Sequence, residues 1–182
     1  MTPFRSLLTL SFLLMLSASV TAQTDRFSAP VLITSAGQSA DVTMAGMLCK
    51  KAGIGATVNA KAAAGDLGDA KTLIIVPGFS SKGLGAAGIS REQEMERVTE
   101  LLAAAKAKKV KVMMLHLGGK PRRGAQSDDF NKASAEASAA MIVVKQGDED
   151  GFFSTLAASK KIPIELVEKI AEAVKPLGAK FQ

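Results

Sequence analysis

The chain has 182 residues and a formal net charge of +6 at pH 7, and all eight of its aromatic residues are phenylalanine. Without tryptophan or tyrosine among the basic residues, it lacks the stacking platforms on which proteins hold bases, so no nucleic acid is expected as a partner. The single cysteine, Cys49, excludes an internal disulfide and is expected to be buried inside a helix. One cysteine and one histidine argue against a zinc site, and we expect neither a metal nor a cofactor.

The first element is a secretory signal peptide over residues 1–22. A single positive side chain, Arg5, precedes an apolar run over residues 6–16, and small residues follow over 17–23. This order is typical of a signal peptide, and we expect cleavage after Ala22. The apolar run is shorter than the roughly 20 residues that a membrane span needs. We therefore expect a periplasmic or secreted protein without a stable membrane span after cleavage.

Two strands and a helix are predicted next along the chain. A short N-terminal segment, residues 23–29, leads into the apolar run Pro30–Thr34, which predicts a strand. Ser39 is a suitable cap for the following helix, which we expect to end at Gly53. Ala56–Ala60 predicts a weaker second strand.

The middle of the chain adds two strands and a long helix. Lys71–Val76 is a strongly apolar run that ends at Pro77, and it predicts the third strand. Ser90 and Gln93 have the spacing of a capping box and open the long helix. Val110–Leu117 is nearly all apolar, as expected for a strand that is buried on both faces.

The last third is expected to contain two more helices and one strand. Ser127 caps a helix, and Ala140–Val144 predicts the fifth strand. Pro163 suits the first turn of a final helix. That helix is expected to bury Ile164, Val167, Ile170, Ala171 and Val174.

Strands that alternate with helices predict a single α/β domain over residues 30–182. We expect a three-layer sandwich around a five-stranded parallel sheet in the flavodoxin-like order 2-1-3-4-5, which is a Rossmann-like architecture. Another doubly wound order remains open, and it would keep the same loops on the same edge of the sheet.

Four loops are expected to meet beyond the carboxyl ends of the strands, where ligands bind in such sheets. They span residues 35–39, 78–89, 118–127 and 146–151. Two of them are long and rich in glycine, which is typical of functional loops. Their backbone N–H groups and basic side chains favour an anion. The predicted ligand-binding residues are Ser35, Gln38, Ser39, Ser80, Ser81, Lys82, Gly83, Arg122 and Arg123.

The glycines at Gly83, Gly85 and Gly88 match the dinucleotide fingerprint in spacing alone. They begin seven residues after the strand ends, and no acidic residue closes the next strand to hold a ribose. A phosphate loop of the Walker type needs lysine where Leu84 stands, and a nucleophile elbow needs glycine where Lys82 stands. We therefore reject all three motifs.

His116 ends the fourth strand and is the candidate catalytic residue, because its unperturbed pKa near 6.5 suits a general base. A lone histidine without a placed partner is more often a residue of the core or the rim. The acidic residues at 148–150 crowd the last loop, and capping the next helix is a simpler role for them than holding a cation.

Several motifs together resemble a family of exported bacterial proteins, the domain of unknown function numbered 6305. They lie at residues 30–39, 80–89, 116–119, 122–128 and 162–163. The resemblance covers nearly all of the mature chain. It implies an exported α/β domain with these loops in common, and it transfers no activity and no catalytic residue.

Three functions stay open at this point. The first is binding of a small anionic metabolite, a carboxylate or a phosphate, at the four loops. The second is a periplasmic hydrolase or transferase that acts on an anionic substrate through His116. The third is an interaction module for an envelope complex, in which the loops bind a protein partner.

Overall fold

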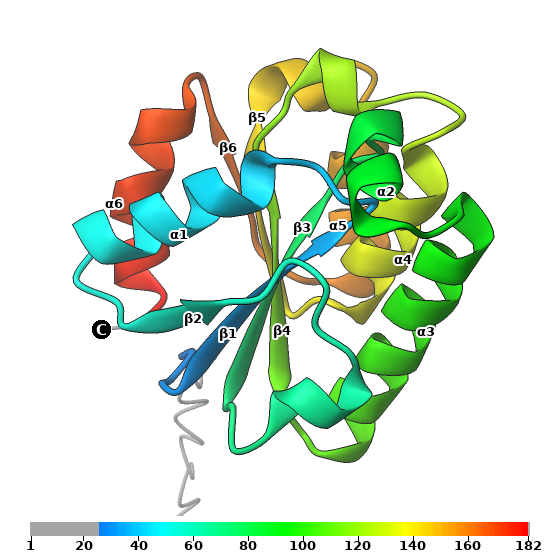
Figure 1. Cartoon of the computed structure of the whole chain (residues 1–182). Helices are drawn as coiled ribbons and strands as arrows, with labels where there is room; N and C mark the ends of the chain where they lie inside the picture. The colour runs from blue at the N-terminus through cyan, green and yellow to red at the C-terminus, as the bar shows by residue number, and fades with distance from the viewer. Residues whose placement is uncertain (1–25, 182) are drawn as a thin grey trace, which may run out of the picture.

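The computed structural model describes residues 26–181. Their fold is built around one sheet of six parallel strands in the order β2-β1-β3-β4-β5-β6 (Figure 1). The strands are β1 (Val31–Ala36), β2 (Ala56–Val58), β3 (Thr72–Pro77), β4 (Lys111–His116), β5 (Ala140–Val144) and β6 (Ile164–Val167). The order of the first five strands is confirmed. The predicted signal peptide, residues 1–22, lies outside the described residues.

Helices cover both faces of the sheet. They are α1 (Asp41–Lys51), α2 (Ser81–Ala87), α3 (Arg91–Ala107), α4 (Asp128–Ala137), α5 (Phe152–Lys160) and α6 (Val174–Ala179). Single 3₁₀ turns are η1 (Ala64–Leu67), η2 (Lys120–Arg122), η3 (Lys145–Gly147) and η4 (Ile170–Ala173). The helices α1 and α6 lie on one face, and α3, α4 and α5 lie on the other, as the three-layer prediction requires (Figure 1). No helix within residues 26–181 has the length and apolar character to cross a membrane.

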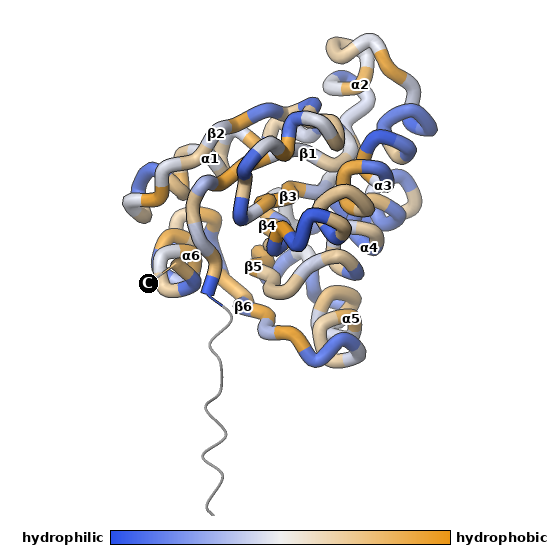
Figure 2. Tube along the Cα trace, turned by 90° about the horizontal axis from the view of Figure 1, so that it is seen from below, coloured by the Kyte–Doolittle hydropathy of each residue, from blue (hydrophilic) through white to orange (hydrophobic). Residues whose placement is uncertain are grey.

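Successive side chains of the buried strands point to opposite faces of the sheet, so the core has two halves, one on each face. In β3, Leu73 and Ile75 face α3, α4 and α5, whereas Ile74 and Val76 face α1 and α6. The central strands are mostly hydrophobic, whereas the helices mix hydrophobic and hydrophilic residues (Figure 2). Cys49 is buried in α1, as predicted.

The final part of the prediction is wrong in two respects. The sheet has a sixth strand, β6, where the sequence pattern predicted the start of a helix at Pro163. The Pro163 carbonyl accepts the Met141 N–H at 3.0 Å and begins the pairing of β6 with β5. The segment Ile164–Val167, which reads Ile-Glu-Leu-Val, is too short for its pattern to distinguish a helix from a strand, and pairing with β5 decides between them. Ala171, expected to be buried, is exposed on η4.

The long glycine-rich loop predicted at residues 78–89 contains the short helix α2. Glycine is a poor helix former, at about 1 kcal/mol per residue relative to alanine, which is why the pattern predicted a loop. The helix is fixed at both ends: the Ser80 hydroxyl accepts the Gly83 N–H at 3.0 Å, and Gly88 ends it with a φ of +71°. The capping box predicted for α3 is present, with Ser90 and Gln93 bonded reciprocally.

Candidate functional site

The loops that follow β1 and β3 meet at the topological switch point of the sheet, beyond the carboxyl ends of these neighbouring strands. Two backbone hydrogen bonds join them directly: the Gly78 N–H donates to the Ala36 carbonyl, and the Ser80 N–H donates to the Gly37 carbonyl, both at 2.8 Å. Gly37 has a φ of +101°, and a Cβ atom there would lie 2.7 Å from the Gly78 oxygen. The two main chains therefore fill the crevice between these strands.

The predicted polar residues at the end of β1 and in the loop that follows it face inward. Ser35 is fully buried, and the Ser39 hydroxyl accepts the Asp41 N–H at 3.1 Å. The Gln38 amide donates to the Ala60 carbonyl at 3.1 Å and to Glu94 Oε1 at 3.0 Å. These three side chains thus hold the loop in place and have little surface to offer a ligand.

A buried ion pair that the sequence analysis missed supports this loop from α3. Glu94 is fully buried, and its Oε1 accepts the Gly37 N–H at 2.8 Å. Arg97 binds both carboxylate oxygens of Glu94, at 2.7 and 2.8 Å, and donates to the Ser35 carbonyl at 2.7 Å. The burial of Glu94 could have been predicted from the sequence. Glu94 precedes the core residue Val98 by four positions and therefore lies on the same face of the helix.

Arg122, at the end of η2, reaches across the switch point. Its Nε donates to Asp41 Oδ2 at 3.2 Å, and its Nη1 donates to the Phe79 carbonyl at 2.9 Å. The stem of the side chain passes over two glycines. A Cβ atom at Gly118 would lie 2.0 Å from Arg122 Cγ, and one at Gly78 would lie 2.9 Å from Cδ. Arg122 is therefore held on three sides, and its side chain is 27% exposed.

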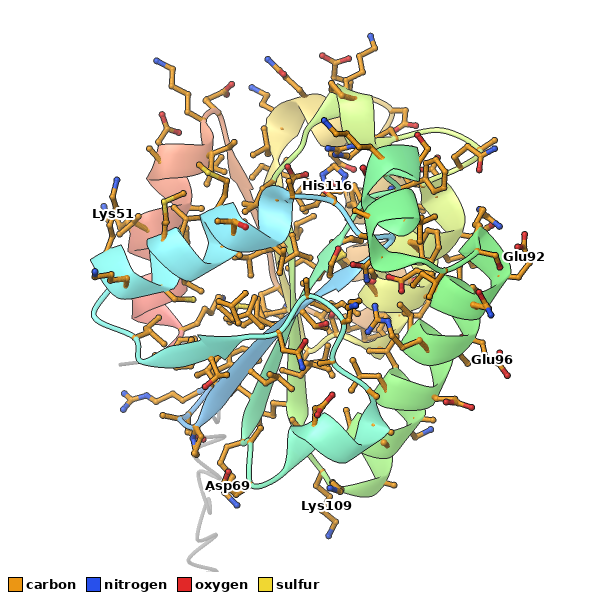
Figure 3. The ribbon with its side chains drawn as sticks, viewed as in Figure 1. Lys51, Asp69, Glu92, Glu96, Lys109 and His116 are labelled. Atoms are coloured by element: carbon orange, nitrogen blue, oxygen red, sulfur yellow. The ribbon has the colours of Figure 1, made fainter. Side chains whose placement is uncertain are left out.

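Two buried side chains, His116 and Asn131, hold the backbone carbonyl of Arg122. Its carbonyl lies 3.2 Å from His116 Nε2 and accepts the Asn131 amide at 3.0 Å. Since a carbonyl only accepts, the His116 ring carries its proton on Nε2. His116 lies at the end of β4 (Figure 3) and is fully buried. Its ring centroid lies 4.6 Å from that of Phe153.

Burial lowers the pKa of His116 to about 4, so the ring is neutral at physiological pH. Its Nδ1 atom has no hydrogen-bond partner among residues 26–181. A Cβ atom at Gly147 would lie 2.6 Å from Nδ1, so the main chain of η3 closes this side of the ring. The geometry gives His116 a role in holding the Arg122 turn, and it leaves the ring without the access that a general base needs.

Arg123, the neighbour of Arg122, is occupied by carboxylates. Its guanidinium binds Asp128 at 2.9 Å and Asp150 at 2.9 Å, and it also donates to the Gly147 carbonyl. The guanidinium carbon lies 4.4 Å from the centre of the Phe152 ring. The hydrogen bonds from Arg123 lower the pKa of Asp150 to about 2. Arg123 therefore ties η2 to α4 and to the loop before α5.

A pocket of about 310 Å³ lies beside this cluster. It is lined by Lys120, Arg123, Gly124, Asp128, Gln146, Glu149 and Asp150. Its three carboxylates outnumber its two basic side chains, so the pocket does not favour an anion.

The remaining predicted site residues lie at the beginning of α2, and a predicted helix cap lies in the loop before α5. Ser80 caps α2, and Gly83 packs against the Gln38 carbonyl, whereas Ser81 and Lys82 are exposed. The predicted capping of α5 is present, because Asp148 Oδ1 accepts the N–H groups of Phe153 and Ser154 at 2.6 and 3.1 Å. Within residues 26–181, no three histidine, cysteine or acidic side chains are placed to share a metal ion.

The model of one protein family, the domain of unknown function DUF6305, matches residues 28–181. The chain belongs to the DUF6305 family. The resemblance drawn from the loop motifs is therefore confirmed. The comparison with curated proteins found no match.

Solved structures resemble this DUF6305 chain only at low similarity. A GDSL-like lipase from Bacteroides thetaiotaomicron is 12% identical, with 79% of this chain and 68% of that chain covered and a TM-score of 0.35. AlinE4, an esterase of the SGNH-hydrolase family, is 14% identical, with 82% and 79% covered and a TM-score of 0.31. Likeness at this level bears on neither the activity nor the site residues of the DUF6305 chain.

Proposed function

We propose that this DUF6305 domain, exported as its N-terminal sequence predicts, binds a small carboxylate or phosphate ligand through Arg122. The observation that carries the proposal is the placement of the Arg122 guanidinium at the switch point of the sheet, where ligands of doubly wound folds bind. The ligand approaches from the solvent side, above the paired loops that follow β1 and β3.

The guanidinium of Arg122 is suited to this role because it is already ordered. Nε and Nη1 are held by Asp41 and by the Phe79 carbonyl, so little conformational freedom is lost when a ligand binds. Nη2 makes no hydrogen bond with residues 26–181, and its two N–H groups can donate to an oxyanion. Lys82 and Ser81, both exposed on the neighbouring α2, add a positive charge and a hydroxyl to the same edge.

The same geometry limits the ligand to one small anionic group. Asp41 offsets part of the positive charge of Arg122, and Arg123 is already committed to Asp128 and Asp150. A single charge-assisted hydrogen bond contributes about 1.5–3 kcal/mol, so we expect weak binding that depends strongly on one side chain.

The alternative of a hydrolase or transferase that uses His116 finds less support. The ring is fully buried, its Nε2 proton is directed to a backbone carbonyl, and Nδ1 faces the main chain at Gly147. A general base has to reach the proton that it removes, either directly or through one water. Binding of an anion through Arg122 does not require access to the His116 ring.

A thermal-shift titration tests the proposal. Phosphate, acetate and succinate are added to the purified protein at about 10 mM each, and binding raises the unfolding temperature by mass action. We expect at least one anion to stabilise the wild type, with a smaller shift in Lys82→Ala and none in Arg122→Gln. Lys175→Ala, an exposed lysine on α6 far from this edge, is the matched control.

Arg122→Gln also removes bonds that hold the loops, so each variant is compared with its own unliganded unfolding temperature. The proposal is wrong if no anion stabilises the wild type, or if Arg122→Gln keeps the full shift.

A further inference from the structure

A second surface of the molecule, unrelated to Arg122, has the features of a docking site. Four large hydrophobic side chains are exposed among residues 26–181, and three of them lie together on α1 and β2: Met44 (37% exposed), Met47 (47%) and Val58 (44%). They adjoin a groove of about 610 Å³ between the helix and the strand, which we call the α1–β2 groove. It is lined by Thr43, Gly46, Met47, Lys50, Gly53, Ile54, Gly55, Ala56 and Val58.

The groove runs along an edge of the sheet. Within residues 26–181, β2 pairs with β1 alone. The Asn59 N–H donates to the Ile33 carbonyl of β1 at 2.9 Å. Because the hydrogen-bonding direction alternates along a strand, Ala56 and Val58 direct their N–H and C=O groups to the open side. These groups can bind a further strand.

The two edges of the sheet differ in how they are protected. On the opposite edge, β6 carries Glu165, and Glu168 follows it directly; they pair with Lys180 at 3.8 Å and with Lys145 at 2.7 Å. Charged side chains of this kind commonly discourage pairing with another strand. The β2 edge, which reads Ala-Thr-Val, has no charged residue.

Charge around the α1–β2 groove indicates what kind of chain it accepts. Residues 42–63 contain three lysines, Lys50, Lys51 and Lys61, and no acidic residue. All three are exposed, and none forms an ion pair with residues 26–181. Lys51 points away from the end of α1 into solvent (Figure 3). A second copy of this chain would bring lysines against lysines, whereas an acidic chain would be attracted.

We propose that the α1–β2 groove binds an extended, acidic segment of a partner protein, which adds a strand to β2. Alternate side chains of this segment are apolar and enter the groove beside Met47, while its acidic side chains lie near Lys50 and Lys51. Strand addition of this kind takes affinity from main-chain hydrogen bonds and specificity from alternate side chains. The inference goes beyond the anion site and depends on none of its residues.

Selection from a library of random displayed peptides against the purified protein provides the probe. We expect enriched sequences that alternate apolar with other residues and carry aspartate or glutamate. A synthetic peptide of the enriched sequence is then titrated by fluorescence anisotropy. Met47→Glu and the pair Lys50→Glu with Lys51→Glu should each weaken binding by about tenfold or more, as expected for central contacts of an interface.

Leu166→Glu is the matched control, since Leu166 is 46% exposed on the opposite edge strand β6 and its replacement should leave the affinity unchanged. Hydrogen exchange gives an independent readout of strand addition. The amides of Ala56 and Val58 should exchange more slowly in the presence of the peptide, whereas that of Leu166 should not change.

Four results would overturn the inference. In the first, the selection enriches no acidic peptide. In the second, its peptides bind Met47→Glu and the lysine pair as tightly as the wild type. In the third, sedimentation velocity reveals a dimer that Met47→Glu dissociates, so that a second copy is the occupant. In the fourth, vesicles of phosphatidylglycerol bind through Met47 and displace the peptide, so that the occupant is a membrane surface. Circular dichroism of each variant confirms that it is folded.

Discussion

The buried neutral state of His116 predicts that the protein loses stability in mildly acidic solution. Burial lowers the pKa of His116 to about 4 in the folded protein, whereas an unfolded histidine has a pKa near 6.5. Between these two values the unfolded chain binds more protons than the folded one. The free energy of unfolding is therefore highest above about pH 6.5 and falls as the pH decreases toward 4.

The two pKa values fix the size of the effect. We expect a loss of about 2 kcal/mol between pH 7.5 and pH 5, and of about 3 kcal/mol once the pH is below 4. At about pH 5 most aspartates and glutamates are still ionised in both states, so they contribute little there. Asp150, whose pKa is lowered to about 2 by Arg123, contributes only in more acidic solution.

The chain has a single histidine, so no other imidazole titrates in the assays described next. Urea unfolding at about pH 7.5 and pH 5 gives the two free energies, and an NMR titration of the imidazole Cε1 proton gives the pKa of the native state directly. His116→Gln keeps a donor for the Arg122 carbonyl and cannot titrate, so its stability should change little between the two pH values. A native pKa near 6.5, or an equal loss in His116→Gln, would refute the reasoning.

Three more predictions follow from buried or crowded positions. Glu94→Ala leaves its arginine partner without a carboxylate inside the protein, and urea unfolding should show a loss of about 3–5 kcal/mol. Gly118→Ala places a methyl group against Arg122 and should lower stability by about 1–3 kcal/mol and abolish the anion-dependent thermal shift. Gly85→Ala, whose methyl group meets open space on α2, is its control and should not destabilise the protein. Burial raises the pKa of Cys49 to about 11, so a chromogenic disulfide reagent should react with it in urea and not in the native protein.

Most of the sheet could be predicted from the sequence because its strands are marked locally. Lys71–Val76 and Val110–Leu117 are apolar runs too short for helices and are bounded by turn residues or charges. The strand β6 was not predictable in this way. Ile164, Val167 and Ile170 have the spacing of a helix face, and only the pairing with β5, a contact between distant parts of the chain, selects the strand.

The location of the candidate site was more accessible to sequence reasoning than the role of each side chain in it. Parallel strands bring their carboxyl ends to one edge, so the loops could be grouped without a structure. Whether an arginine faces a ligand or a carboxylate depends on partners far along the chain. Arg122 and Arg123 are adjacent in sequence, yet Asp150, 27 residues after Arg123, occupies the guanidinium of Arg123. Nη2 of Arg122, in contrast, makes no hydrogen bond with residues 26–181.

The unequal edges of the sheet also bear on how the protein behaves when it is crowded. Growth of a fibre by edge-to-edge pairing requires that both edge strands of every molecule can pair with a neighbour. Here β2 is open and β6 is guarded by Glu165 and Glu168. A molecule with only one edge strand open to pairing ends any fibre that it joins. The open β2 edge is therefore compatible with resistance to fibrous aggregation.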